Sequence, residues 1–375
     1  MNSRNPLIGF NASFYTPRRV GINTVIRSLA AELSREWQLV IYTAYPGDFA
    51  ELPVRFRPIP RWTSRFYLRF FWNQLSLPAL IRQDKLDLFL SPVPELPSSL
   101  SIPALAVIHD LTPLVLPGSS RLHHTTLFRW STHMLGAASC LVAVSRHTLE
   151  DIDRMRLYPD KPRQVIYNGT HFLDLVDGPG FANAPARPYL LYVGGFLPHK
   201  NVPLLITAFH ELAQEIPHQL VLAGWGPERI MRPLRALITA LGIQGRIILR
   251  HDVPDPELAE LYRHCDLFIY PSRYEGFGLP VLEAMACGAP VLSSDAASLP
   301  EVGGDAVTYF APDSRDQLVA KIRDLLADPA RRRESAEKGR VRARAFTWER
   351  AAREFSDLIR QTIQSGDKKQ PTRQH

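Results

Sequence analysis

Residues 270–283 read YPSRYEGFGLPVLE, and this stretch predicts its local structure more sharply than any other part of the chain. The apolar run LFIY that leads into it, residues 267–270, predicts a buried strand. Gly276 and Gly278 predict a sharp turn that a ligand can approach closely, because glycine has no Cβ. Pro280 suits the first turn of a helix, where a missing N–H costs nothing. The stretch therefore predicts a strand, a glycine turn and a helix in direct succession.

Two carboxylates flank this glycine turn. Glu275 precedes the turn, and Glu283 lies one turn into the expected helix. The free N–H groups at the start of a helix carry partial positive charge and favour a phosphate. Each carboxylate can accept hydrogen bonds from two neighbouring hydroxyl groups. A phosphate site flanked by two such acceptors has the chemistry that a sugar nucleotide needs.

The segment from Tyr270 to Pro312 resembles the donor-site signature of retaining glycosyltransferases of family 4, which have the GT-B fold. Glu275 and Glu283 match the E-x7-E pair of that family. The resemblance covers nearly the whole chain and is most specific in this segment. It implies an α/β chain of two Rossmann-like, doubly wound parallel-sheet domains with an interdomain cleft. It also implies that Glu283 holds the ribose hydroxyls and that Glu275 holds hydroxyls of the donor sugar.

A second glycine loop resembles another part of the same donor site. Gly194 and Gly195 follow an apolar run, and Lys200 can meet a pyrophosphate as a point charge. His199 stands where the family usually has arginine, and His251 stands where it usually has glycine near the nucleobase. The nucleobase preference therefore does not follow from the resemblance. The alternative for this loop is a plain strand-to-helix turn with a solvated lysine.

Two further positions in the first half of the chain resemble family elements. His109 follows the apolar run 104–108 and resembles a histidine beside the donor sugar, although a lone histidine is often structural. Gly21 precedes the first expected helix and resembles a glycine near the β-phosphate, with an ordinary helix entry as the alternative. The resemblance thus implies the catalytic residues His109, Lys200 and Glu275, and the donor-binding residues Gly21, Gly194, Gly195, Lys200, Glu275, Gly276, Phe277, Gly278, Leu279 and Glu283.

Alternating apolar runs and amphipathic segments predict a parallel α/β architecture throughout. The stretch 177–188 is rich in Pro, Gly and Ala, which is typical of a linker. The expected strands cover residues 7–10, 39–42, 86–90, 104–108, 140–144, 165–166, 189–193, 219–223, 247–249, 267–270 and 290–293. The expected organisation is an N-terminal acceptor-binding domain (1–175), a linker (176–188), a nucleotide-sugar-binding domain (189–345), a C-terminal helix that crosses back to the N-terminal domain (346–365) and a disordered tail (366–375).

Composition narrows the setting in which the protein works. The sequence shows no apolar signal segment at its start and no run as long as a membrane span, so we expect a cytoplasmic protein. Cys140, Cys265 and Cys287 have no metal-binding spacing and predict small buried side chains in a reducing compartment. The net charge is +7, and residues 1–175 hold 19 Lys and Arg against 13 Asp and Glu. This basic half favours an anionic partner.

Residues 61–74, RWTSRFYLRFFWNQ, interleave arginines with aromatic side chains. On one helix, Arg61, Arg65 and Arg69 would form a basic stripe. This pattern suggests an interfacial helix for an anionic membrane surface, which would place the protein at the inner face of the cytoplasmic membrane. The alternative is a core-packed helix with a solvated arginine face. Nucleic acid is not expected as a partner, because no nucleic-acid-binding motif accompanies these charges.

Together these features predict a metal-independent, retaining hexosyltransferase. It would move a sugar from a nucleoside diphosphate sugar to a hydroxyl of a glycan or lipid-linked glycan. No metal ion and no cofactor beyond this co-substrate are expected, because Lys200 and the helix start at Leu279 would stabilise the charge of the leaving pyrophosphate. Residues 271–280 resemble bacterial mannosyltransferases, which favours mannose and cell-surface polysaccharide assembly. The alternatives are a sugar-nucleotide epimerase with the same fold and a non-catalytic subunit that binds sugar nucleotides.

Overall fold

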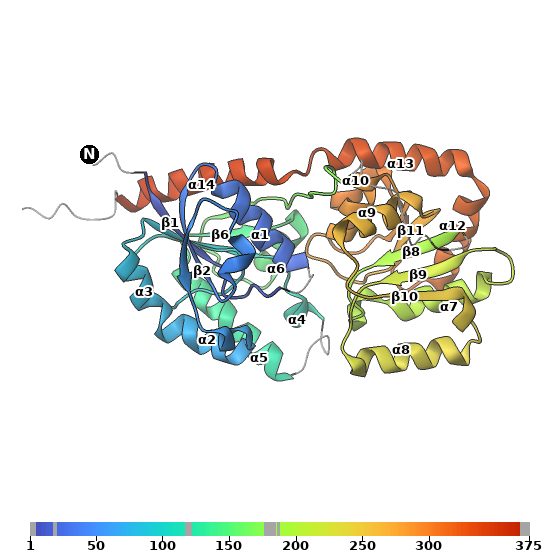
Figure 1. Cartoon of the computed structure of the whole chain (residues 1–375), viewed down its shortest axis with the longest axis horizontal. Coiled ribbons are helices and arrows are strands. Elements are labelled where there is room, and N and C mark those ends of the chain that lie inside the picture. Colours follow the sequence, from blue (N-terminus) through green and yellow to red (C-terminus); the bar gives the residue numbers. More distant parts are fainter. Residues whose placement is uncertain (1–4, 18–20, 117–121, 176–184, 186–187, 368–375) are drawn as a thin grey trace, which may run out of the picture. The chain divides into compact units, whose positions relative to one another are not determined.

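The computed structural model describes residues 5–17, 21–116, 122–175, 185 and 188–367, without the side chains of residues 66, 122–125, 127, 366 and 367. The chain divides into two compact units. Unit 1 comprises Met1–Gly169 and Trp348–His375, and unit 2 comprises Thr170–Thr347. Each unit is built of a central parallel sheet with helices packed around it (Figure 1).

The sheet of unit 1 has seven parallel strands in the order β3-β2-β1-β4-β5-β6-β7. Its inner strands are continuous apolar runs, such as ALAVI in β5, because both of their faces are buried. The chain moves outward from β1 to β3 and then returns to β4 beside β1, so the strand order reverses between β1 and β4. The strands are β1 (Leu7–Asn11), β2 (Gln38–Thr43), β3 (Arg55–Pro58), β4 (Leu88–Ser91), β5 (Ala104–Ile108), β6 (Cys140–Ala143) and β7 (Arg163–Val165).

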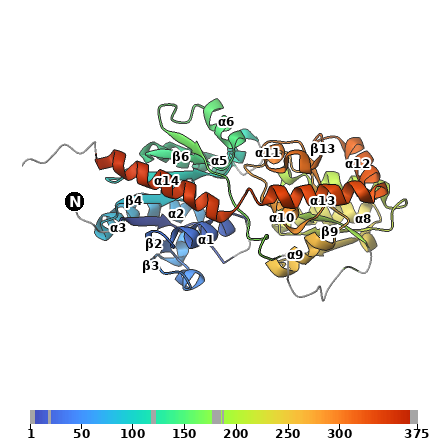
Figure 2. The same cartoon turned by 90° about the horizontal axis from the view of Figure 1, so that it is seen from above.

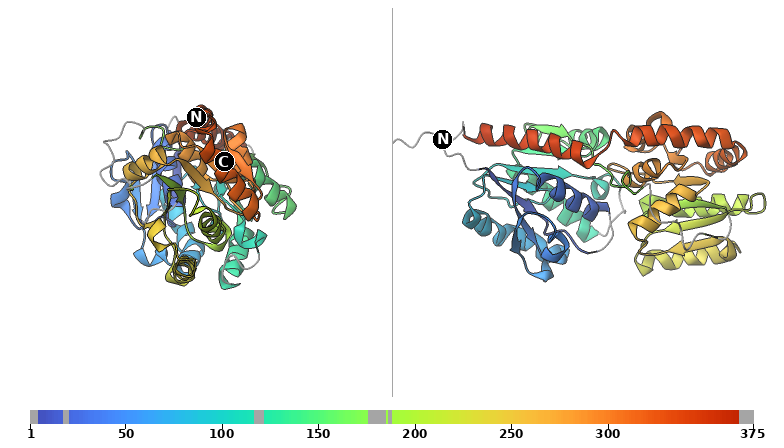
Figure 3. Two further views of the ribbon diagram at one scale, coloured as in Figure 1. Left: turned by 90° about the vertical axis from the view of Figure 1, so that its right-hand side faces the viewer. Right: turned by 45° about the horizontal axis from the view of Figure 1, so that its top comes forward.

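The helices of unit 1 include one from the far end of the sequence. The C-terminal helix α14 lies beside α1 (Figures 1 and 3), and the indole of Trp37 donates to Ser356 Oγ at 2.9 Å. The helices are α1 (Gly21–Leu33), α2 (Phe66–Leu75), α3 (Leu77–Asp84), α4 (Thr112–Val115), α5 (Leu122–Met134), α6 (Arg146–Arg154) and α14 (Trp348–Asp367), with 3-10 turns η1 (Pro46–Phe49), η2 (Arg61–Ser64) and η3 (Leu135–Ala137).

The sheet of unit 2 repeats this plan with six parallel strands in the order β10-β9-β8-β11-β12-β13. Here the order reverses between β8 and β11. In open α/β sheets ligands bind outside the carboxyl ends of the strands at such a reversal. The strands are β8 (Tyr189–Val193), β9 (Gln219–Ala223), β10 (Ile247–Arg250), β11 (Leu267–Tyr270), β12 (Val291–Ser294) and β13 (Thr308–Phe310).

The helices of unit 2 pack on both sides of its sheet. Helix α13 lies against α10 (Figure 2), and α12 lies against α7. The helices are α7 (Val202–Leu212), α8 (Glu228–Ala240), α9 (Asp255–His264), α10 (Leu279–Cys287), α11 (Leu299–Gly303), α12 (Arg315–Ala327) and α13 (Pro329–Ala343), with 3-10 turns η4 (Pro198–Lys200), η5 (Gln244–Arg246) and η6 (Gly304–Ala306).

The structure differs from the predicted elements mainly at the edges. Strands β3 and β13 lie outside the predicted apolar runs, because these short edge strands read RFRP and TYF. The division between the units falls after Gly169, and helix α14 extends to Asp367 rather than 365. The predicted linker lies mostly outside the described residues, as does the tail 368–375. All three cysteines are buried and free, as predicted.

The predicted basic stripe of residues 61–74 is wrong. Residues 61–64 form a 3-10 turn, Arg65 has an extended backbone (φ −81°, ψ 122°), and α2 begins only at Phe66. Arg61, Arg65 and Arg69 therefore do not share one helix. Arg69 is 3% exposed, and both arms of its guanidinium donate to the Glu95 carboxylate at 2.9 Å. Its partner is 26 residues away in the sequence, so local helical spacing gave no sign of this pair.

The core-packed alternative for the same segment is also only half right. Phe70 and Trp72 are buried, each 5% exposed, whereas Trp62, Tyr67 and Phe71 are exposed. The side chain of Phe66 lies outside the described residues. Helix α2 therefore turns one charged side chain inward and several apolar side chains outward.

Candidate active site

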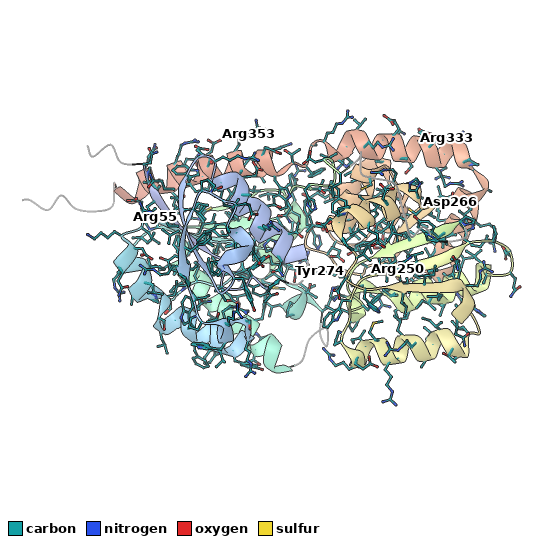
Figure 4. All side chains as sticks on the ribbon, in the orientation of Figure 1. Arg55, Arg250, Asp266, Tyr274, Arg333 and Arg353 are labelled. Carbon is teal, nitrogen blue, oxygen red and sulfur yellow. The ribbon has the colours of Figure 1, made fainter. Side chains whose placement is uncertain are left out.

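The residues with the strongest sequence signal lie at the strand-order reversal of unit 2. Lys200 is in the segment that follows β8, and Glu275 is in the segment that follows β11. Because β8 and β11 are neighbouring parallel strands, their carboxyl ends bring these two loops together. Figure 4 labels Asp266 and Tyr274, which lie before and after β11 and mark its two ends.

Lys200 and Glu275 form a closed hydrogen-bond network with Tyr270. The Lys200 ammonium donates to both Glu275 oxygens, at 2.7 and 2.9 Å, and to the Tyr270 hydroxyl at 3.1 Å. The Tyr270 hydroxyl in turn donates to Glu275 Oε1 at 2.8 Å. An ammonium has three donors, so this network uses all of them. A phosphate that binds Lys200 therefore replaces one of these three bonds.

The network keeps Glu275 ionised in a largely buried position. Burial raises the pKa of Glu275, but the Lys200 ammonium and its hydrogen bonds outweigh burial and lower the pKa below its usual value. Burial and the Glu275 charge together raise the pKa of Tyr270 well above its usual value, so its hydroxyl stays protonated. Side-chain exposures of 17% for Lys200 and 11% for Glu275 leave a narrow opening to solvent.

The glycine loop after β8 is built by close backbone packing. Gly194 has φ +149°, and a Cβ there would lie 2.9 Å from the Tyr192 hydroxyl. Gly224, in the loop after β9, fits so closely that a Cβ would lie 1.9 Å from the Gly194 carbonyl oxygen. Gly195 has more room, since a Cβ at that position would lie 3.6 Å from the Trp225 carbonyl oxygen. Gly194 is therefore required by packing whether or not a phosphate binds there.

The glycine turn after Glu275 leads directly into α10. Gly278 has φ +101° and precedes Leu279, the first residue of the helix. A Cβ on Gly278 would lie 2.7 Å from Leu299, so this position excludes larger residues on two grounds. Gly276 is buried, and Phe277 packs edge-on against Phe346 with ring centroids 5.9 Å apart. These contacts fix the start of α10, where the predicted phosphate site lies.

Glu283 occupies a second buried polar cluster, on the first turns of α10. It accepts a hydrogen bond from Tyr262 at 3.0 Å. Burial raises the pKa of Glu283 to about 7, although the Tyr262 bond and the charge of His171 oppose that rise. His171 pairs with Asp255 at 3.0 Å beside this cluster. Glu283 thus titrates near neutral pH, whereas Glu275 stays ionised.

Two of the predicted site residues, Gly21 and His109, lie in unit 1. Gly21 is the first residue of α1, and residues 18–20 before it lie outside the described part. His109 Nε2 donates to the Pro92 carbonyl at 2.7 Å, because a carbonyl can only accept. Burial lowers the pKa of His109, which favours the neutral ring. Its Nδ1 is then a hydrogen-bond acceptor, a suitable partner for a hydroxyl group.

The two departures from the family pattern have structural partners in unit 2. The backbone carbonyl of His199 accepts from the Arg273 N–H at 2.7 Å, which joins the Lys200 loop to the loop after β11. His251 Nδ1 lies 2.8 Å from the Gly224 carbonyl oxygen. The His251 side chain therefore contacts the loop after β9, whereas the His199 contact is made by the backbone and would be available to any residue.

Tyr270 and Tyr262 were not among the predicted site residues. Both are fully buried, and each places its hydroxyl on one of the two glutamates. A tyrosine at the end of an apolar strand, as in LFIY, is typical of a core residue. The sequence position of these tyrosines gave no sign of a site. Their hydroxyl groups did, because a buried tyrosine hydroxyl usually needs a hydrogen-bond partner.

The described part of the chain was also compared with the requirements of a metal site and of a membrane-spanning helix. No group of three or more His, Cys, Asp or Glu side chains in this part is arranged to hold a metal ion. Within the same residues, no helix combines the length and apolar character needed to cross a bilayer.

Two family models match the chain. The model described as glycosyl transferases group 1 matches residues 181–342, and the model described as glycosyltransferase family 4 matches residues 20–171. The O-antigen chain mannosyltransferase B of Escherichia coli is 31% identical over 260 residues, which cover 66% of this chain and 67% of that protein. Sequence therefore relates both units to glycosyltransferases.

Solved structures show the same fold over most of the chain. Sucrose-phosphate synthase from Thermosynechococcus elongatus superposes with a TM-score of 0.79 and 22% identity, covering 96% of this chain and 100% of that chain. HepE of Anabaena in complex with UDP-glucose superposes with a TM-score of 0.73 and 17% identity, covering 95% and 100%. The chain therefore belongs to the family 4, or group 1, glycosyltransferases and has the GT-B fold.

Proposed function

We propose that this glycosyltransferase moves mannose or a related sugar from a nucleoside diphosphate sugar to an acceptor hydroxyl, with retention of the anomeric configuration. The acceptor would be a glycan or a lipid-linked glycan of a bacterial cell-surface polysaccharide. The similarity to a mannosyltransferase supports the donor sugar, and the UDP-glucose complex of HepE supports a nucleotide-sugar donor.

One observation carries the proposal most directly. Lys200 and Glu275, which lie 75 residues apart in the sequence, meet in one network beside the glycine turn that opens α10. The network provides a cation for a pyrophosphate, a carboxylate for sugar hydroxyls and helix N–H groups for phosphate oxygens. A purely structural ion pair would not need a glycine turn and a helix start beside it.

In the proposed reaction, the bond between the anomeric carbon and the β-phosphate oxygen breaks as the acceptor oxygen bonds to the same face of that carbon. The leaving phosphate oxygen takes the proton of the acceptor hydroxyl. Lys200 and the N–H groups at Leu279 stabilise the charge that develops on this oxygen. Glu275 orients the donor sugar, and Glu283 accepts from the ribose hydroxyls. His109 serves as an acceptor for a sugar hydroxyl through its Nδ1.

The proposed reaction needs no metal ion and no cofactor besides the co-substrate, since Lys200 and the helix N–H groups meet the leaving charge. Activity should therefore be unchanged in saturating EDTA. Loss of transfer that Mg²⁺ or Mn²⁺ restores would contradict this part of the proposal.

The proposal is tested in two steps. A thermal-shift panel of UDP-, GDP-, dTDP- and ADP-sugars identifies the donor, because a ligand that binds only the native state raises the Tm. The selected donor is then incubated with lipid-linked glycan acceptors, and the anomeric configuration of the product is read by NMR. A product with inverted configuration, or epimerised donor formed without any acceptor, would overturn the proposed transfer.

A further inference from the structure

An exposed apolar surface covers the outer side of α2 and the neighbouring part of α5 in unit 1. We call it the α2–α5 face. The exposed fraction of its residues ranges from 39% for Leu68 to 77% for Leu75, so all of them are accessible to solvent. The α2–α5 face consists of Trp62, Tyr67, Leu68, Phe71, Leu75 and Trp130.

This face is continuous across two helices that are distant in sequence. The rings of Phe70 on α2 and Trp130 on α5 lie 6.1 Å apart, and the rings of Phe70 and Phe71 lie 5.7 Å apart. Leu68, Phe71 and Leu75 are three and four residues apart and therefore share one side of α2. Figures 1 and 3 show α2 and α5 on the same side of unit 1.

Helix α2 departs from the usual arrangement of a surface helix. A surface helix normally buries its apolar stripe and exposes its charges. Here Arg69 and Asn73 face inward, where both donate to the Glu95 carboxylate at 2.9 Å. Phe70 and Trp72 are also buried, but four other apolar side chains of α2 are left exposed: Tyr67, Leu68, Phe71 and Leu75. The inward polar contacts fix α2 in this orientation, so the exposed apolar side is a property of the fold.

The charged side chains of the two helices that carry the α2–α5 face have one sign. Neither α2 nor α5 contains an Asp or Glu. Arg61, Arg65 and Arg129 are exposed beside the apolar side chains, and no carboxylate among the described residues pairs with them. A second copy of the chain would place the same positive charges against each other in a symmetric contact. An apolar face rimmed by arginines without carboxylate partners instead fits an anionic bilayer surface.

We propose that the α2–α5 face docks the protein onto an anionic lipid surface, with the aromatic and leucine side chains in the interface and the arginines on the headgroups. Arg69, which the sequence pattern assigned to this role, takes no part because it is buried against Glu95. The proposal concerns binding alone and does not depend on the proposed transfer reaction.

Co-sedimentation with phosphatidylcholine vesicles, with and without phosphatidylglycerol, tests this proposal on the full chain. The parent protein should bind only the anionic vesicles. The triple variant Arg61→Ser, Arg65→Ser, Arg129→Ser should bind on the order of 100-fold more weakly, since each basic residue near such a surface contributes about fivefold. The variant Phe71→Ser, Leu75→Ser, Trp130→Ser should also lose binding, while raised salt should weaken the parent.

Matched controls come from α13 of unit 2. Val341 is 59% exposed, and Arg333, labelled in Figure 4, is exposed on the same helix. The variants Val341→Ser and Arg333→Ser should bind vesicles like the parent. All substituted positions are exposed, so circular dichroism and Tm should be unchanged. Three outcomes would overturn the proposal: no binding by the parent, equal binding by the triple variants, or a parent dimer that the apolar triple variant converts to monomer.

Discussion

Each unit of the molecule holds a buried ion pair at the point where its strand order reverses, and the two pairs differ in what surrounds them. In unit 1, the side chains of Arg69 and Glu95, taken without their backbone atoms, are 4% and 8% exposed. In unit 2, Lys200 and Glu275 are 17% and 11% exposed. The same crevice of the same fold is therefore filled in one unit and left partly open in the other.

Side chains of unit 1 bond to one another across its crevice. Asn11 at the end of β1 donates to Ser91 Oγ at 3.2 Å, and Ser91 at the end of β4 donates to the Glu95 carbonyl at 2.8 Å. The Arg69 guanidinium also lies 4.4 Å from the centroid of Phe14. These side chains bond to one another, and the planar guanidinium of Arg69 is held in a fixed geometry by Glu95.

The crevice of unit 2 has a different set of groups. Lys200 is a compact point charge on a flexible stem, which can exchange one partner for another. Glu275 is followed by a glycine turn and the start of α10, whose N–H groups favour an anion. The comparison shows that each sheet of this fold offers a crevice. The candidate binding site of unit 2 differs from the structural pair of unit 1 in three features: a helix start, a lysine and partial exposure to solvent.

The largest expected effect is on stability, from Arg69→Ala. The substitution leaves the Glu95 carboxylate buried without its cation, which costs about 3–5 kcal/mol of unfolding free energy. Urea unfolding followed by circular dichroism measures this loss. The matched change Arg65→Ala, at an exposed position one turn earlier, should stay within about 0.5 kcal/mol of the parent. An unfolding midpoint unchanged in Arg69→Ala would mean that the unit 1 pair is not structural.

The next largest effect is expected on turnover, from Lys200→Ala. Removal of the cation that meets the leaving pyrophosphate should lower kcat by about 10²–10³-fold, the effect typical of losing one preorganised donor. Initial rates with a labelled donor measure it. Lys200→Arg should restore only part of the rate, because a guanidinium cannot reproduce the three-way contact with Tyr270 and Glu275. A parental kcat in Lys200→Ala would make this ion pair structural, like that of unit 1.

The sequence predicted the structural features that depend on neighbouring residues. It missed the features that depend on residues far away in the chain. The buried strands and the turn into α10 follow from apolar runs, glycines and a proline within a few residues of each other. The place of Arg69 depends on Glu95, and the edge strand β3 depends on pairing with β2 rather than on its own composition. The network partner Tyr270 was missed because a strand tyrosine reads as core until its hydroxyl is located.

The third prediction separates the two glutamates of unit 2 by pH. Burial raises the pKa of Glu283 to about 7, so its proton stabilises the fold fully below about pH 4.5 and this contribution is lost as the pH rises through about 7. Ribose hydroxyls favour the ionised form, so nucleotide affinity should rise by up to about tenfold per pH unit below pH 7 and level off above it. Calorimetry with the nucleoside diphosphate from pH 5.5 to 8.5, a range of about 3 units, measures this slope.

Glu283→Gln is the control for that slope. The amide keeps the shape of the side chain but does not titrate, so affinity should become lower and flat with pH. The apo-protein Tm should also lose the part of its pH dependence that comes from Glu283. A slope that persists in Glu283→Gln would show that Glu283 is not the group whose titration controls nucleotide affinity.

The smallest effect is expected from Tyr270→Phe, which removes one hydroxyl from the Lys200–Glu275 network and leaves the ring stack with Tyr192 in place. Tyr270 is a positioning residue, so kcat should fall by roughly the value of one hydrogen bond, about 0.5–1.5 kcal/mol, while KM for the donor changes less.

A positioning role for Tyr270 also predicts a shift that a purely structural role would not give. Without the Tyr270 hydroxyl, the Glu275 carboxylate loses a donor, so its pKa rises and the acidic limb of the kcat/KM profile moves to higher pH. Tyr189→Phe removes an equally buried hydroxyl at the other end of the same sheet, where it donates to the Leu261 carbonyl at 2.8 Å. Tyr189→Phe should lose about as much unfolding free energy as Tyr270→Phe, but its kcat/KM profile against pH should not shift. If both variants gave the same pH profile of kcat/KM, Tyr270 would be only a core residue. Lys200 and Glu275 would then form the site without help from the Tyr270 hydroxyl.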